Sequence, residues 1–243
     1  LVCNQTPPSN GKPSLMSFDE VLTLFHEFGH GLQHMLTTVD LPQAAGINNV
    51  EWDAVELPSQ FMENWCFDKS TLLNIAKHWE TGEKLAEEDY NKLCENRTFN
   101  CGLATLRQLH FAITDLRLHS NKLKYQGKEP DQIRRDIAKN TTVIEPIDED
   151  KFLCCFSHIF AGGYSAGYYS YKWAEVLSAD AFSMFEEADL ENINNVRSIG
   201  KKFKDTILGL GGSLPPLEIF KLFRGREPST DSLIKHLGLS SID

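Results

Sequence analysis

Three ionisable side chains stand within five consecutive residues of this chain, which reads His26-Glu27-Phe28-Gly29-His30. In an α-helix, residues four positions apart lie on the same face, so His26 and His30 can reach one metal ion together. Two histidines at this spacing are typical ligands of zinc. Glu27 follows the first histidine directly and would act as general base toward a zinc-activated water. The motif therefore predicts zinc-dependent hydrolysis.

A catalytic zinc site needs a third protein ligand and keeps one position open for water. The acids that follow the motif are Glu51, Asp53, Glu56 and Glu63. Glu56 stands in the apolar run AVELP, where a carboxylate is costly unless a cation pairs with it. We therefore expect Glu56 to be the third ligand. Asp53 and Glu63 would accept the N–H groups of the imidazoles, the alternative being that both lie on a solvated helix face.

A helix must present both histidines, and the sequence marks its start. Ser17 and Glu20 form a capping box, and the apolar residues after them recur at helical spacing, which predicts a helix over residues 18–38. A second helix is expected over residues 54–67. Pro58 fits in its first turn, because a proline further inside would remove a hydrogen bond.

The rest of the chain also has helical patterns, and we expect a mainly α fold with at most a small sheet. The segment KFLCCFSHIF, residues 151–160, fits either a short strand or a buried helix. Residues 161–185 pass from a glycine-rich turn into a helix. Further helices are expected over 70–81, 86–98, 102–124, 130–139, 196–209 and 215–223, followed by one that Ser229 or Thr230 caps and Gly238 ends.

Composition excludes several classes of partner. Lysine and arginine number 24 against 34 aspartates and glutamates, so the formal net charge is -10. A protein that binds the nucleic-acid backbone needs a basic surface, so we expect no nucleic-acid partner. No stretch of about 18 apolar residues occurs, so we expect no membrane partner. The six cysteines form no CxxC pair and are expected to be reduced thiols of a soluble, intracellular protein.

The zinc motif is part of a longer match. HEFGH, the following NVEWDAVELPSQFMENW, the segment HIFAGGYSAGYYSY and the C-terminal FRGREPSTDSLIKHLGL resemble the zinc peptidase family of thimet oligopeptidase, oligopeptidase A and dipeptidyl carboxypeptidase. The resemblance covers essentially the whole chain. It implies a zincin-type helical catalytic domain with one zinc ion per chain. It also implies that Glu56, which precedes the PSQ stretch, is the third ligand.

The glycine- and tyrosine-rich segment carries a second set of residues by the same resemblance. In that family a histidine and tyrosines of this segment bind substrate and stabilise the tetrahedral intermediate, which implies these roles for His158, Tyr164, Tyr168 and Tyr171. Phenol hydroxyls are neutral donors that can meet an oxyanion without repelling the metal. For Tyr169 we expect packing in the core instead.

We therefore expect a metalloendopeptidase that hydrolyses short, unstructured peptides. Residues 1–243 would form a single catalytic domain, the C-terminal part of a larger two-lobed enzyme whose N-terminal lobe is its partner. We expect it in the cytoplasm, or in mitochondria or chloroplasts if a transit peptide precedes Leu1.

Two alternatives to this function remain open. A dipeptidyl carboxypeptidase needs a fixed cation for the substrate C-terminus, which Arg224 or Arg226 could supply, although a loop arginine more often is solvated or pairs with acids. The second alternative is a zinc-binding helical fragment without useful turnover.

Overall fold

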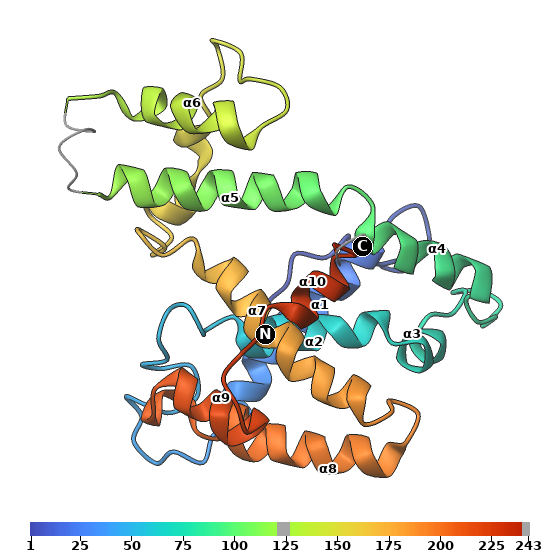
Figure 1. Cartoon of the computed structure of the whole chain (residues 1–243). Coiled ribbons are helices and arrows are strands. Elements are labelled where there is room, and N and C mark those ends of the chain that lie inside the picture. The colour runs from blue at the N-terminus through green and yellow to red at the C-terminus, as the bar shows by residue number, and fades with distance from the viewer. Residues whose placement is uncertain (121–126, 240–243) are drawn as a thin grey trace. The chain divides into compact units, whose positions relative to one another are not determined.

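The computed structural model describes residues 1–120 and 127–239. These residues form helices joined by turns and loops (Figure 1). The same ranges contain no β-strand, and two isolated bridges join Ser9 to Lys12 and Lys77 to Lys84. The predicted mainly α fold with at most a small sheet is confirmed. No described helix combines the length and the apolar character that crossing a bilayer requires.

Contacts divide the chain into two compact units, which are described separately. Unit 1 comprises residues 1–99 and 174–243, and unit 2 comprises residues 100–173. Helix α7 (Ser170–Glu187) begins in unit 2 and continues in unit 1. The other helices of unit 1 are α1 (Phe18–Met35), α2 (Leu57–Asn64), α3 (Lys69–Ile75), α4 (Glu87–Thr98), α8 (Ile193–Phe203), α9 (Pro216–Arg224) and α10 (Asp231–His236).

The core of unit 1 is built largely from aromatic rings. Phe61 of α2 stacks on Phe203 of α8 with 4.0 Å between ring centroids, and it meets Phe182 and Phe185 of α7 at 5.8 and 5.4 Å. Phe223 of α9 meets Phe203 at 5.4 Å. Each such pair contributes about 1 kcal/mol beyond the burial of its rings. The early helices of unit 1 therefore obtain their core partners from the later part of the chain.

Unit 2 is smaller. Its helices α5 (Cys101–Leu118) and α6 (Pro130–Thr141) pack against each other. Phe111 of α5 stacks on Phe152 with 5.0 Å between ring centroids and meets Tyr168 edge-on at 5.7 Å. These rings join α5 to the glycine- and tyrosine-rich segment that follows α6.

For α1 the sequence predicts the start better than the end, whereas the helix predicted over 54–67 begins three residues later, at Leu57. The capping box of Ser17 and Glu20 is present at the start of α1, which ends at Met35 instead of residue 38. Pro58 lies in the first turn of α2, as predicted, and three residues of 3-10 helix, Trp65–Phe67, continue that helix. The helix predicted over 70–81 ends at Ile75.

The structure differs from three of the predicted elements in more detail. Residues 76–85 turn back on themselves through Gly82, whose φ of +71° suits glycine, and so replace the end of the helix predicted over 70–81. The segment KFLCCFSHIF forms neither a strand nor a buried helix but two short 3-10 turns, Phe152–Cys155 and Ser157–Ile159. After Phe203, α8 continues as a π-helical turn, Lys204–Leu208. Residues 121–124 of the helix predicted over 102–124 lie outside the described residues.

Candidate metal centre

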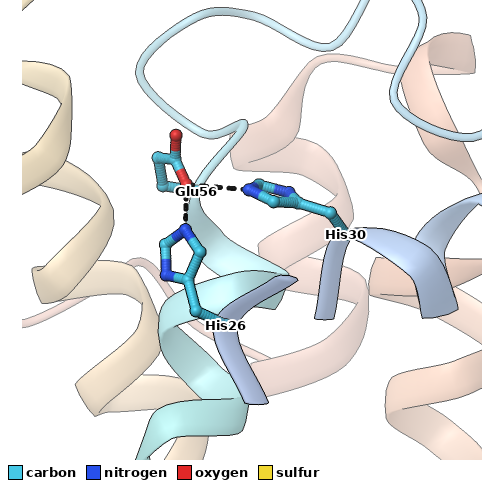
Figure 2. Close-up of side chains that lie close together, drawn as sticks. All are labelled: His26, His30 and Glu56. Atoms are coloured by element: carbon cyan, nitrogen blue, oxygen red, sulfur yellow. Dashed lines mark ion pairs between the residues drawn. The ribbon is translucent and has the colours of Figure 1, made fainter. Parts of the chain in front are cut away.

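His26 and His30 of α1 point toward the carboxylate of Glu56, which directly precedes α2 (Figure 2). The Glu56 Oε2 atom lies 3.2 Å from His26 Nε2 and 3.1 Å from His30 Nε2. One ligand atom of each residue lies within 4.8 Å of the other two, and no second group of this kind occurs among the residues that the structure describes. The three residues that the sequence predicts as ligands thus come together.

Helices α1 and α2 can approach this closely because Gly29 has no side chain. A Cβ atom at Gly29 would lie 2.5 Å from the carbonyl oxygen of Pro58 and 2.5 Å from the Cα atom of Ser59. Gly29 stands between the two histidines in the sequence, so this contact holds the histidine-bearing part of α1 against the start of α2.

A serine supports the glutamate. The Ser59 hydroxyl lies 2.8 Å from Glu56 Oε2 and 2.9 Å from the Glu56 carbonyl oxygen. Both residues are buried. Sequence analysis singled out neither Ser59 nor Gly29. The i+3 spacing of Ser59 after Glu56 is a signal that could have found the serine, whereas the contact of Gly29 arises only when two helices meet.

The donor set fits zinc. Zinc ligands at about 2.0–2.1 Å in a tetrahedron are about 3.3 Å apart, and the two N–O distances to Glu56 are 3.2 and 3.1 Å. Glu56 is 5% exposed, so its negative charge needs a cationic partner. Two imidazole nitrogens and one carboxylate oxygen form a ligand set that zinc enzymes use.

The charges around the three candidate ligands also favour a cation. The carboxylate of Glu63 of α2 forms a hydrogen bond with the other ring nitrogen of His26, with 2.6 Å between Glu63 Oε1 and His26 Nδ1. Burial alone would lower the pKa of His26, but the hydrogen bonds to Glu56 and Glu63 outweigh burial and raise it from 6.5 to about 10. Positive charge is therefore stabilised between the two carboxylates. Glu63 has the geometry predicted for an acceptor of an imidazole N–H.

Two further predicted residues flank the site. Glu27 is half-buried on α1, directly after His26. Asp53 is half-buried in the turn before α2, and its role as an acceptor for an imidazole stays a prediction.

Comparison with known proteins decides the family. The model of peptidase family M3 matches residues 1–239 of this chain. The chain belongs to peptidase family M3. It is 61% identical over 242 residues to the organellar oligopeptidase A, chloroplastic/mitochondrial, of Arabidopsis thaliana, a match that covers 98% of this chain and 30% of that protein.

Two other relatives give the same result for this M3 chain. The probable cytosolic oligopeptidase A of Arabidopsis thaliana is 59% identical over 239 residues, covering 98% of this chain and 34% of that protein. The oligopeptidase A of Escherichia coli is 50% identical over 239 residues, covering 98% and 35%. The M3 chain thus spans about a third of the length of these relatives.

The four aromatic residues predicted to handle substrate form one cluster in unit 2 of the M3 chain. The ring centroid of His158 lies 6.1 Å from that of Tyr164, 5.9 Å from that of Tyr168 and 6.3 Å from that of Tyr171. Tyr164 and Tyr171 stack with 4.8 Å between centroids. We call these four residues the aromatic cluster.

Members of the aromatic cluster differ in exposure. His158 is exposed, and Tyr164 and Tyr171 are half-buried. Tyr168 is 8% exposed, and its hydroxyl donates to Gln108 Oε1 at 3.1 Å. Burial raises the pKa of Tyr168 to about 12, so its hydroxyl keeps its proton. Tyr169, for which we expected core packing, is instead 39% exposed, whereas its neighbour Tyr168 is buried.

The arginines considered for binding a substrate carboxylate have a different partner. Asp180 of α7 is 0% exposed, and its Oδ1 atom lies 3.0 Å from Arg224 Nε and 2.6 Å from Arg226 Nη2. The backbone N–H of Ser229 donates to Asp180 Oδ2 at 2.7 Å. Arg224, the last residue of α9, and Arg226, two residues further on, therefore join the end of α9 to α7.

Proposed function

We propose that the protein is a zinc-dependent endopeptidase that hydrolyses short, unstructured peptides. The observation that carries this proposal is the convergence of His26, His30 and Glu56, with Glu27 next to the first histidine. Membership of peptidase family M3 and the likeness to oligopeptidases A support peptide hydrolysis. We infer that one zinc ion is held per chain.

His26, His30 and Glu56 would hold the metal. Zinc bound there would supply a Lewis acid that could polarise a carbonyl and lower the pKa of water. Glu27 takes a proton from the attacking water and delivers it to the leaving amine. His158, Tyr164 and Tyr171 bind the substrate and donate to the developing oxyanion, as the resemblance implies. Tyr168 has the same role by resemblance, although its donation to Gln108 supports packing within unit 2.

We also propose how the enzyme is organised into domains and where in the cell it is located. Residues 1–243 act as one catalytic domain, and a further lobe completes the enzyme, since the relatives are about three times as long. The second lobe limits substrates to short peptides. Placement in the cytoplasm or in an organelle is supported by relatives whose names give both locations.

Dipeptidyl carboxypeptidase activity gains no support from the arginines. Arg224 and Arg226 both pair with the buried Asp180 and therefore do not offer a free charge to a substrate C-terminus. We infer cleavage within the peptide rather than removal of its last two residues.

A quenched fluorescent peptide tests the proposed function. The full-length protein should cleave it, lose the activity with a chelator and recover it with zinc. A peptide with a blocked C-terminus should be cleaved equally well. Cleavage that requires a free C-terminus would identify a dipeptidyl carboxypeptidase, and zinc binding without cleavage would identify a metal-binding protein without turnover.

A further inference from the structure

A buried carboxylate holds the backbone of the glycine- and tyrosine-rich segment. Asp115 of α5 is 0% exposed. Its Oδ1 atom accepts the backbone N–H of Ala166 at 2.9 Å, and its Oδ2 atom accepts that of Tyr168 at 2.9 Å. His119, one turn further along α5, places Nδ1 2.8 Å from Asp115 Oδ1. Each oxygen of this buried charge therefore has a hydrogen-bond partner, as a buried carboxylate requires.

The backbone that Asp115 holds has an unusual conformation. Ala166 has a φ of +55°, in the left-handed region that residues with a side chain rarely adopt. Backbone N–H groups around a left-handed residue turn toward one side and can bind an anion there. In this protein the anion is the carboxylate of Asp115, so the helix α5 supplies the charge that keeps Ala166 in this conformation.

The aromatic cluster depends on this stretch of backbone. Tyr164 precedes Ala166 by two residues, and Tyr168 follows it by two. Tyr164 N–H donates to the His158 carbonyl at 2.9 Å, and the Ser165 hydroxyl donates to the Ile159 carbonyl at 2.6 Å. A change in the conformation of residue 166 would therefore shift Tyr168 and Tyr171, which follow it, relative to His158 and Tyr164, which are joined by their own hydrogen bond.

We propose that Asp115 is a positioning residue, which holds Ala166 and Tyr168 so that His158, Tyr164 and Tyr171 present their polar atoms to the substrate. The proposal rests on the proposed peptidase function. Asp115 itself touches no substrate and acts through the backbone of residues 166–168. Loss of the carboxylate should therefore reduce kcat much more than it changes KM. Misplaced hydrogen-bond donors stabilise the transition state less well, while binding of the substrate in its ground state changes little.

Asp115→Asn is the first test, in the full-length zinc-loaded protein. Asparagine keeps the shape but offers one acceptor oxygen for two N–H groups, so one hydrogen bond is lost. We expect kcat to fall on the order of tenfold to a hundredfold while KM changes far less and the zinc content stays the same. Ile133→Val, a change at a buried residue of α6, is the control for lower stability alone. It should leave kcat nearly unchanged.

Ala166→Val tests the same contact from its other side and does not depend on how Asp115→Asn folds. Ala166 is exposed, but a β-branched residue at a φ of +55° is strongly disfavoured, so the segment must move away from Asp115. The matched control is Ala104→Val, the same change at an exposed residue of α5. Ala166→Val should lower kcat as Asp115→Asn does, and Ala104→Val should not.

Hydrogen exchange separates this proposal from the proposed function. The amides of Ala166 and Tyr168 should exchange faster in Asp115→Asn than in the unmodified protein, whether or not the protein cleaves peptides. Unchanged exchange, or faster exchange with unchanged kcat, would overturn the positioning role. An unmodified protein that binds zinc but cleaves no peptide would instead overturn the proposed function, and the exchange result would still decide whether Asp115 holds the segment.

Discussion

Gly29 of α1 and Ser59 of α2 meet through their backbones, so closely that a Cβ atom at Gly29 would lie 2.5 Å from the Ser59 Cα atom. Ser59 in turn contacts the carboxylate of Glu56. The distance between the two helices thus sets the distance between the histidines and the third candidate ligand.

Gly29→Ala should weaken zinc binding and lower the melting temperature, because the added methyl group forces α1 away from Pro58 and Ser59. Gly31→Ala is the matched control on the same helix. Its Cβ would meet the end of the Leu1 side chain at 3.0 Å, which can move aside. Titration with zinc in competition with a chromogenic chelator measures both variants. Equal zinc affinity for the two would show that the helix contact does not set the ligand geometry.

Glu27→Gln should leave zinc bound and abolish peptide hydrolysis. The amide keeps the size of the side chain but cannot take a proton from water, and losing a general base costs on the order of a hundredfold or more in rate. Zinc content by atomic absorption and cleavage of a quenched peptide are the measurements. A variant that retains most of its activity would remove Glu27 from the mechanism.

Glu63→Ala should lower the affinity for zinc about 10–100-fold, because an imidazole that loses its carboxylate acceptor is less basic and less well oriented. The contact at stake is the 2.6 Å distance between Glu63 Oε1 and His26 Nδ1. Glu51→Ala, at an exposed acid before α2, removes the same charge without this contact and should bind zinc normally.

Asp180→Asn should destabilise the protein by about 3–5 kcal/mol at pH 7, the usual effect of breaking a buried ion pair. Burial alone would raise the pKa of Asp180, but hydrogen bonds from Arg226, Ser229 and Arg224 lower it below its ordinary value of 3.8. A carboxylate with a lowered pKa stabilises the fold above its unfolded-state pKa, and that contribution is lost as the pH falls through the folded-state value.

The difference in stability between Asp180→Asn and the unmodified protein should therefore narrow as the pH falls below about 3.9. Urea unfolding at pH 7 and at successively lower pH measures it. A difference that stays constant across this range would mean that the ionised carboxylate is not the stabilising group.

Sequence predicted what is encoded locally. The spacing of His26 and His30 defines a helix face, and the apolar surroundings of Glu56 mark it as an acid that needs a cation. The capping box of Ser17 marks the start of α1, and Pro58 lies in the first turn of α2 as predicted, although that helix begins at Leu57 rather than at residue 54.

What the sequence could not predict arises between segments that are distant in the chain. Asp115 is 51 positions from its partner Ala166, and nothing in the α5 sequence distinguishes it from a solvated helix acid. Asp180 and Arg226, 46 positions apart, likewise look like ordinary surface charges until the fold pairs them. The turn of residues 76–85 is a different case, because it is closed by its own hydrogen bonds and by Gly82, a local signal that hydrophobic periodicity does not capture.

Unit 1 is built from two separate stretches of the chain, residues 1–99 and 174–243, and this affects the order in which it can fold during synthesis. Phe61, five residues after the candidate ligand Glu56, has its stacking partner at Phe203. At about 5–20 residues per second, translation from one to the other takes on the order of ten seconds. Throughout that interval α2 lacks the aromatic ring that stacks on Phe61 in the folded protein, so the apolar face of α2 stays exposed. We expect metal loading to be a late event, which follows the synthesis of α8 and α9.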